Sequence, residues 1–179
     1  VLTHDGTDFD WAAAGGGGGI TAASQWRLTA DATGTQNPIA ANWEEVDTDG
    51  YATLGSSMTE SSGIFTFPST GIWYINFSAF WNTAWGVTVV ENWTQVKIKT
   101  TVDNSTWGSS GECTEGIGDD NTTRTSYAQP AMNFIFDVTD TTTHKCSFTA
   151  EVYDQTNLNL NGSTGGNVTW VTFIRLGDT

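Results

Sequence analysis

The chain has 179 residues, and its 6 basic and 20 acidic side chains give a net charge of −14 at pH 7. This balance excludes nucleic-acid binding and docking on anionic membranes, because both depend on Lys and Arg to hold phosphate. Aromatic residues make up 12% of the chain and charged residues 15%, which excludes a disordered chain. The chain has no apolar run of about 18 residues, so no transmembrane helix is predicted.

A glycine tract at residues 15–19 divides the start of the chain from the rest. Consecutive glycines lose too much backbone entropy to hold regular structure, so the tract is predicted to be a linker. Residues 1–14 are too few to bury a core and are expected to form a stalk segment, while residues 20–179 form the globular domain. The chain begins with Val1 and has no signal-peptide pattern, so we expect a piece of a longer chain.

Beyond residue 20 the sequence predicts short β-strands. Apolar side chains recur at every second position in five runs, which are residues 71–81, 95–102, 131–138, 146–153 and 168–176. This period is typical of strands with a buried face, and turn signals rich in Gly, Pro and Asn separate the runs. No stretch of about 12 residues has helical spacing. We predict an all-β antiparallel sandwich of about eight to ten strands.

Two of these runs carry apolar side chains on both faces. In residues 71–81 and 168–176, large apolar residues occupy odd and even positions alike. A sandwich buries only one face of each strand, and no helix is predicted that would cover the other face. A second subunit is the simplest cover, which predicts an oligomer. The alternative is a central strand covered by loops of the same chain.

Two acidic segments carry oxygen ligands of the kind that bind metal ions. Residues 46–50 read VDTDG, as at the start of a calcium loop, but Met58 stands where that loop needs an acidic ligand. A turn is therefore predicted there. Asp119, Asp120 and Asn121 carry side-chain oxygens that would suit calcium, and this alternative stays open. We expect no metal and no cofactor.

Two tryptophans stand in polar, glycine-rich surroundings outside the predicted strands. Trp85 and Trp107 are candidates for binding a sugar or a protein partner, and we expect both on loops at the end of the domain away from the linker. The alternative is that they close the ends of the sandwich.

Nucleophilic catalysis is not predicted. The chain has no G-x-S-x-G nucleophile elbow. His144 and Cys146 lie two residues apart on a predicted strand, which separates their side chains by about 7 Å and is too far for a nucleophile and its base. The cysteines, Cys113 and Cys146, are expected to be free thiols, although a disulfide between neighbouring strands stays open.

One segment carries a family resemblance. Residues 63–77 read GIFTFPSTGIWYINF, which resembles the signature of the complement globular-head family within the tumour-necrosis-factor-like jelly rolls. The signature is a Phe, five residues, a Gly, and then large apolar residues at alternate positions, here Phe65, Gly71, Trp73, Ile75 and Phe77. Residues 151–161 and 165–177 are similar to the last two strands of that family.

The resemblance implies a ten-stranded jelly roll that assembles as a homotrimer around a three-fold axis. We expect five apolar residues of the two-faced strands to contribute to this axis, namely Trp73, Ile75, Phe77, Trp170 and Phe173. Residues 1–11 also resemble short repeats of bacteriophage fibre proteins, and residues 24–34 are similar to fibre-tip and decoration domains of tailed phages.

These observations together predict a non-enzymatic structural protein on a virion surface. It would be the trimeric head of a phage fibre or a capsid decoration. Its partner would be a host glycan, a host protein or a neighbouring capsid subunit. A secreted binding head of the complement or cytokine kind is the alternative, and a small polysaccharide-cleaving enzyme is the second alternative, because the many carboxylates include enough for a glycosidase pair.

Overall fold

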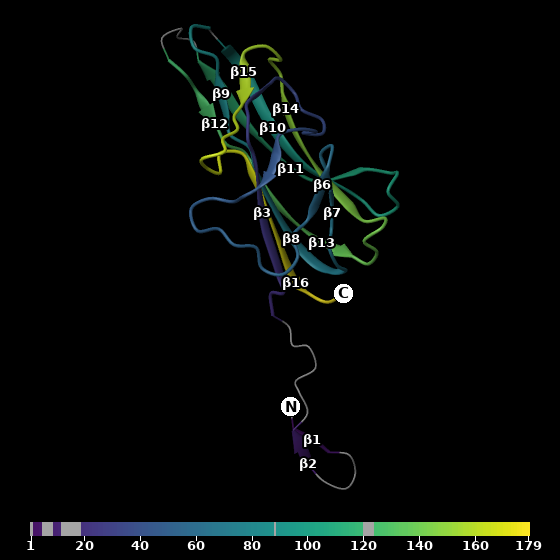
Figure 1. Ribbon diagram of the computed structural model, residues 1–179. Coiled ribbons are helices and arrows are strands. Elements are labelled where there is room, and N and C mark those ends of the chain that lie inside the picture. Colours follow the sequence, from purple (N-terminus) through teal and green to yellow (C-terminus); the bar gives the residue numbers. More distant parts are fainter. Residues whose placement is uncertain (1, 5–8, 12–18, 88, 120–123) are drawn as a thin grey trace.

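The computed structural model describes residues 2–4, 9–11, 19–87, 89–119 and 124–179. The described residues contain strands and turns and no helix (Figure 1), which confirms the predicted all-β class. None of them accordingly forms a helix that could span a membrane. Strands β1 (Leu2–His4) and β2 (Phe9–Trp11) pair with each other in the predicted stalk segment. Most of the predicted linker, residues 15–18, lies outside the described residues.

The first layer of the sandwich is a five-stranded antiparallel sheet with the order β13-β8-β16-β3-β5. Its strands are β3 (Ala22–Leu28), β5 (Trp43–Glu45), β8 (Gly71–Ser78), β13 (Ala131–Val138) and β16 (Trp170–Gly177). Ala22 at the start of β3 is paired with Arg175 near the end of β16. The chain therefore enters and leaves the sandwich at the same end.

The second layer is another five-stranded antiparallel sheet, with the order β11-β10-β14-β7-β6. Its strands are β6 (Thr59–Ser61), β7 (Ile64–Thr66), β10 (Val89–Thr101), β11 (Gly108–Asp119) and β14 (Lys145–Val152). Strands β10 and β11 form a long hairpin, paired from Val89 with Asp119 at one end to Thr100 with Gly108 at the other.

A four-stranded sheet with the order β12-β9-β15-β4 lies at the end of the molecule away from the C-terminus (Figure 1). Its strands are β4 (Ala32–Thr33), β9 (Trp81–Thr83), β12 (Tyr127–Ala128) and β15 (Leu158–Leu160). Strand β9 follows β8 after Ala79 and Phe80, and β12 precedes β13, so this sheet extends the first layer. We call the end of the molecule that carries it the distal end.

Aromatic rings fill the space between the layers. Phe65 on β7 lies at their centre, with ring centroids 5.3 Å from both Phe148 on β14 and Phe173 on β16. Trp26 on β3 and Trp43 on β5 meet the same ring edge-on, each at 5.5 Å. Edge-to-face pairs at these distances add to the free energy gained by burying the rings. Phe65 of the quoted signature is thus the centre of the core.

The core also contains four of the five residues assigned to the trimer axis. Trp73, Ile75, Phe77 and Phe173 are each at most 1% exposed in the single chain, so they have no side-chain surface left for a neighbour. That part of the axis prediction was wrong. Strands β8 and β16 carry apolar residues on both faces, and a period of two does not tell which face meets the second sheet. Only Trp170 points away from the core, and it is half-buried.

Candidate binding surfaces

The outer face of the first sheet is not covered by another described sheet. The pairing registers align Ile135 of β13, Tyr74 of β8, Ile174 of β16 and Ala23 of β3 in one row across it. Ile135 is 58% exposed, and the next two are half-buried. We call this row the apolar row. It gives four neighbouring strands a continuous apolar band that meets solvent in the single chain.

A polar row lies beside the apolar row on the same face. Asn133, Asn76, Thr172 and Gln25 follow one another across the same four strands. The amide of Gln25 donates to the Thr172 hydroxyl at 2.9 Å, so this part of the row is already joined within the chain. Such alternation of an apolar band with paired amides and hydroxyls is suited to a protein interface, whose apolar core is bordered by polar groups.

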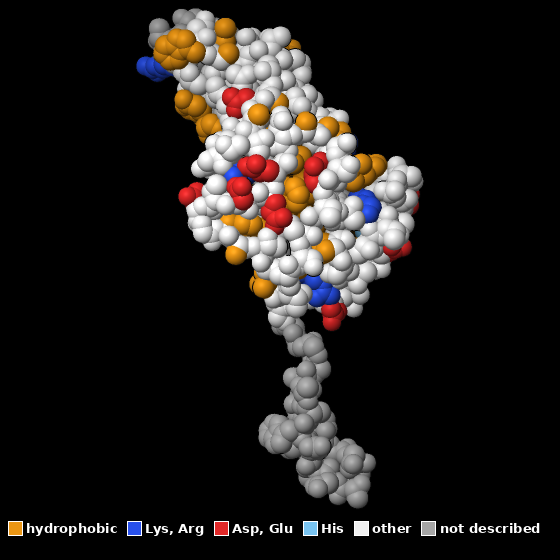
Figure 2. Space-filling model, viewed as in Figure 1, with side chains coloured by type: hydrophobic (Ala, Val, Ile, Leu, Met, Phe, Trp, Pro, Cys, Tyr) orange, Lys and Arg blue, Asp and Glu red, His pale blue; other side chains and the backbone are white. Residues whose placement is uncertain are grey.

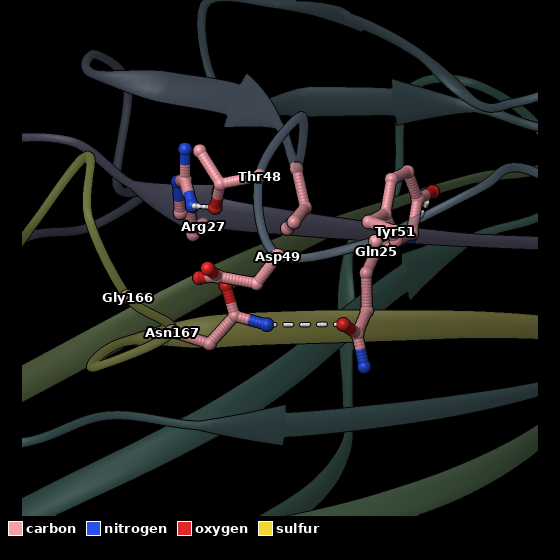
Figure 3. Close-up of a pocket in the computed structure, with 9 residues that line it drawn as sticks. Gln25, Arg27, Thr48, Asp49, Tyr51, Gly166 and Asn167 are labelled. Atoms are coloured by element: carbon pink, nitrogen blue, oxygen red, sulfur yellow. Dashed lines mark hydrogen bonds between the residues drawn. The ribbon is translucent and has the colours of Figure 1, made fainter.

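A polar pocket of about 360 Å³ lies at the edge of this face, under the segment that follows β5 (Figure 3). Arg27 of β3 lies beside it and is 1% exposed. Its guanidinium donates to Glu44 at 2.7 Å, to Thr48 at 2.8 Å and to Asp47 at 2.8 Å. These partners satisfy the buried charge, so Arg27 holds the segment against the sheet and is not free to bind an anion.

The predicted turn at residues 46–50 forms the rim of this pocket. Asp49 and Gly50 both have positive φ, 58° and 80°, and the amide of Tyr51 donates to the Thr48 carbonyl at 3.1 Å. Two successive residues with positive φ are typical of a tight type I′ turn. The sequence prediction of a turn in place of a calcium loop is therefore confirmed, and Asp47 is engaged with Arg27.

Tyr51 and Asn167 complete the pocket wall, and both are joined to β3. The backbone amide of Gln25 donates to the Tyr51 hydroxyl at 2.9 Å, and the Asn167 amide donates to the Gln25 side chain at 3.0 Å (Figure 3). Burial is the main reason why the pKa of Tyr51 is raised, so the phenol stays protonated at neutral pH. The polar groups around the pocket therefore bind one another and hold the segment after β5 against β3.

The distal end carries exposed aromatic side chains. Trp85, in the loop from β9 to β10, is 71% exposed, and Tyr153, directly after β14, is 70% exposed. Tyr127 of β12 is also exposed and stacks on Phe80, with the ring centroids 5.6 Å apart. Figure 2 shows hydrophobic side chains gathered at this end. Trp85 thus lies on a loop at the distal end, as expected, and large exposed aromatics are typical anchors for a partner.

The loop that carries Tyr153 is fixed by Asp154. Its carboxylate accepts hydrogen bonds from the backbone amides of Thr156 and Asn157 at 2.9 and 3.1 Å. Partial burial acts to raise the pKa of Asp154, but the hydrogen bonds from these two residues outweigh it and the pKa is lowered. The amide of Ala84 donates to the Asn157 carbonyl at 2.8 Å, which ties this loop to the loop of Trp85.

Trp107 does not share the distal end with Trp85. It lies in the connection from β10 to β11, next to Gly108, whereas Trp85 precedes the opposite end of β10. The paired span from Val89 to Thr100 corresponds to roughly 36 Å of strand. The expectation that both tryptophans lie at the distal end was therefore wrong for Trp107, because local sequence does not show at which end of the long hairpin each loop lies.

Trp107 instead forms one wall of a second pocket, of about 220 Å³. Its other lining residues are Asn37, Pro38, Ile64, Lys99 and Ser147. Ile64, Lys99 and Ser147 alternate with core residues of β7, β10 and β14, so the pocket opens on the outer face of the second sheet. We call it the Trp107 pocket. Sequence reasoning selected Trp107 but missed Lys99, because nothing along the chain shows that these two residues meet.

His144 and the two cysteines, which have side chains of catalytic type, lie in places that suit a structural role. His144 is buried, its ring nitrogens lie 3.2 and 3.1 Å from the hydroxyls of Thr139 and Thr143, and it stacks on Phe136. Cys113 and Cys146 are both free thiols, as expected. Burial raises the pKa of Cys146 well above its ordinary value, which keeps it a thiol and a poor nucleophile.

No candidate metal cluster is found among the residues whose positions are described. Within that part of the chain, no three His, Cys, Asp or Glu side chains converge in a way that would hold an ion. The open alternative of a calcium site at Asp119, Asp120 and Asn121 lies outside the described side chains. The candidate binding sites among the described residues are therefore the exposed aromatics of the distal end and the Trp107 pocket.

Comparison with known proteins gives matches in structure. No family model matches the sequence, and no curated protein matches it. The solved structure of murine APRIL at pH 5.0 aligns over 87% of this chain and 98% of its own, with a TM-score of 0.58 and 12% identity. The structure of Eiger TNF from S. frugiperda aligns over 89% of this chain and 95% of its own, with a TM-score of 0.56 and 9% identity. At such identities the likeness shows the fold, which is the tumour-necrosis-factor-like jelly roll.

Proposed function

We propose that this tumour-necrosis-factor-like jelly roll is a non-enzymatic binding head, that it assembles as a homotrimer, and that it serves on a virion surface as the tip of a phage fibre or as a capsid decoration. The observation that carries the proposal is the apolar row on the outer face of the first sheet. A binding head needs an assembly face and a separate contact face. The chain offers the apolar row for the first and the exposed aromatics of the distal end for the second.

The apolar row supports assembly through its chemistry and its position. Tyr74 and Ile174 are half-buried and Ile135 is exposed in the single chain, although all three lie on the strands that form one wall of the core. A second copy that covers the row would remove this apolar surface from water. The family resemblance implies three copies around one axis, and a closed ring of this kind leaves no copy of the row uncovered.

The test of assembly is the mass of the chain in solution. We expect multi-angle light scattering to give three times the 19.2 kDa of one chain at micromolar concentration. Ile135→Asp places a charge in the row and should produce folded monomers. Val102→Asp is the matched control, because Val102 is 60% exposed in the β10–β11 connection, and it should remain a trimer. A stable wild-type monomer would overturn the proposed assembly.

The distal aromatics support the binding role. The loop of Trp85 is hydrogen-bonded to the loop of Tyr153 through the Ala84 amide and the Asn157 carbonyl, so the backbone that carries both rings is fixed. Rings exposed in this way can stack on sugar or insert into a protein pocket without a large loss of side-chain entropy. We expect the double variant Trp85→Ala with Tyr153→Ala to weaken attachment to host cells or to capsids while the trimer stays intact. Normal attachment would assign these residues to capping the sandwich.

The absence of catalysis is part of the proposal and has its own test. His144 is satisfied by two threonine hydroxyls, and Cys146 is buried and neutral. Carboxylate pairs at the surface are still numerous enough to consider a glycosidase. Incubation of the purified chain with capsular or cell-wall polysaccharide, followed by measurement of new reducing ends, should give no release. Release of fragments would establish the enzyme alternative.

A secreted head of the complement or cytokine kind remains the second candidate. It is favoured by the fold match with a solved structure of Eiger TNF. The virion location is favoured by the resemblance of residues 1–11 and 24–34 to fibre and decoration proteins. The sequence encoded ahead of residue 1 separates the two: a fibre stalk or virion anchor supports the first, and collagen-like repeats behind a signal peptide support the second. Electron microscopy of virions labelled on this domain would then distinguish fibre from capsid.

A further inference from the structure

The Trp107 pocket is lined by apolar and polar groups. Trp107, Pro38 and Ile64 contribute apolar surface, and Lys99, Ser147 and Asn37 contribute an amine, a hydroxyl and an amide. A pyranose ring has matching surfaces, since its C–H face packs on an aromatic ring and its hydroxyls seek donors and acceptors. The lining therefore offers both kinds of contact that a sugar makes.

The volume limits the ligand to one sugar unit. About 220 Å³ is smaller than the roughly 300 to 1,000 Å³ that encloses a drug-sized molecule. A monosaccharide at the end of a glycan fits this limit, and the rest of the glycan would extend into solvent.

Lys99 is the feature that selects among sugars. Its ammonium group has one described partner, the side-chain oxygen of Asn37 at 3.4 Å, which is long for a hydrogen bond. The neighbouring Lys97 is paired with Glu151 at 2.7 Å, so Glu151 is already neutralised. No carboxylate among the described residues forms an ion pair with Lys99. A half-buried cation is thus left beside the pocket in a chain that is strongly acidic overall.

Ser147 adds a hydroxyl at the floor. It is 4% exposed, and strand pairing places it between Lys99 of β10 and Ile64 of β7. Its hydroxyl can donate a hydrogen bond to a ligand oxygen in the pocket or accept one from a ligand hydroxyl. The lysine and the serine together offer a charged and a neutral contact to the same ligand.

We infer that the Trp107 pocket binds a single carboxylated sugar, of the hexuronic acid class, with its ring on Trp107 and its carboxylate on Lys99. A long polyanion is not the expected ligand, because its further charges would meet the acidic surface of the chain. The pocket lies on the outer face of the second sheet and the apolar row on the outer face of the first. The inference therefore adds a site that does not depend on the proposed trimer or on the distal aromatics.

The experiment compares two probes that differ only at one carbon. Surface plasmon resonance is measured on the full chain over albumin that carries β-D-glucuronide groups and over albumin that carries β-D-glucose groups. We expect the glucuronide surface to bind at least tenfold more tightly. Trp107→Ala should weaken that binding roughly tenfold or more, in line with the loss of one stacked ring.

Two lysine variants make the result specific. Lys99→Gln should abolish the preference for glucuronide over glucose, and Lys145→Gln, on the same sheet but outside the pocket, should leave it unchanged. A thermal melt of each variant confirms folding before binding is read. Absence of glucuronide binding, equal binding of both sugars by the wild type, or an unchanged preference in Lys99→Gln would each overturn the inference. Stronger binding to albumin that carries glutamate groups would also overturn it and point to an acidic peptide.

Discussion

Gly71, the glycine of the quoted signature, gives the sharpest test of how this fold is held. Its φ is +136°, and a Cβ placed on it would lie 2.5 Å from the carbonyl oxygen of Gly177, a backbone atom of the neighbouring β16. The backbone conformation alone costs an L-residue about 1 to 3 kcal/mol, and the forced approach adds an overpacking cost of similar size. Gly71→Ala should therefore lower the free energy of unfolding by about 3 to 4 kcal/mol.

Two other glycines separate these contributions. Gly50 also has positive φ, +80°, but a Cβ there has no neighbour within 4 Å, so Gly50→Ala should cost only the conformational part, about 1 to 2 kcal/mol. Gly116 has neither a positive φ nor a close neighbour, and Gly116→Ala should be neutral or stabilise the chain by up to about 1 kcal/mol. The ordering of the three variants follows from their geometry.

Urea unfolding followed by tryptophan fluorescence measures this series. With a slope of about 2 kcal/mol per molar urea, Gly71→Ala should unfold at a midpoint about 1.5 to 2 M below the wild type. All proteins are compared at one protomer concentration, because assembly adds to apparent stability. If Gly71→Ala unfolds no earlier than Gly50→Ala, the close approach of Gly71 to Gly177 is not what makes glycine necessary here, and the reasoning fails.

Three further predictions concern acid stability, thiols and the core. Hydrogen bonds from the Thr106 and Ser105 amides lower the pKa of Asp103, and those from Thr142 lower the pKa of Asp140. A carboxyl group whose pKa is lower in the folded chain stabilises the fold above its unfolded pKa near 4, and this contribution is lost as the pH falls further. Asp103→Asn should therefore narrow the difference in urea midpoint between pH 6 and pH 3. Reducing agent should leave the melting temperature unchanged, and a large drop on reduction would contradict the free thiols. A thiol reagent should modify Cys113 in the native chain but Cys146 only after unfolding, because Cys113 is half-buried and Cys146 fully buried. Phe65→Ala should cost about 3 to 5 kcal/mol in urea unfolding, since the ring meets four others in the core; a cost below about 1.5 kcal/mol would show that the core closes over the gap.

The fold class and much of the core were predictable because strand periodicity is local. Phe136 and Val138 of β13 are buried and Met132 and Phe134 are half-buried, as the alternation in residues 131–138 indicated. The choice of face on β8 was not predictable in the same way. Trp73 and Tyr74 are both large and apolar enough for a core, and only the position of the second sheet decides which of them it buries.

The candidate sites depend on contacts between residues that lie far apart in the sequence. Trp85 and Trp107 could be selected because an aromatic ring in a polar loop stands out locally. Their separation along β10 and β11 follows from the length and register of that hairpin, which the residues around them do not encode. Arg27 was also missed, since Glu44 becomes its neighbour only when β5 pairs with β3, and Asp47 only when the segment after β5 folds back over β3.

The pairing of Ala22 with Arg175 places the point where the chain enters the jelly roll beside the point where it leaves. A domain with adjacent ends can be inserted into a surface loop of another protein without distorting either one. It can also be circularly permuted, with its original ends joined and new ends opened at an exposed loop. The jelly roll could therefore be transplanted as a cassette. Its distal aromatics, which lie at the opposite end of the domain from the splice, would then display their binding properties on an unrelated scaffold.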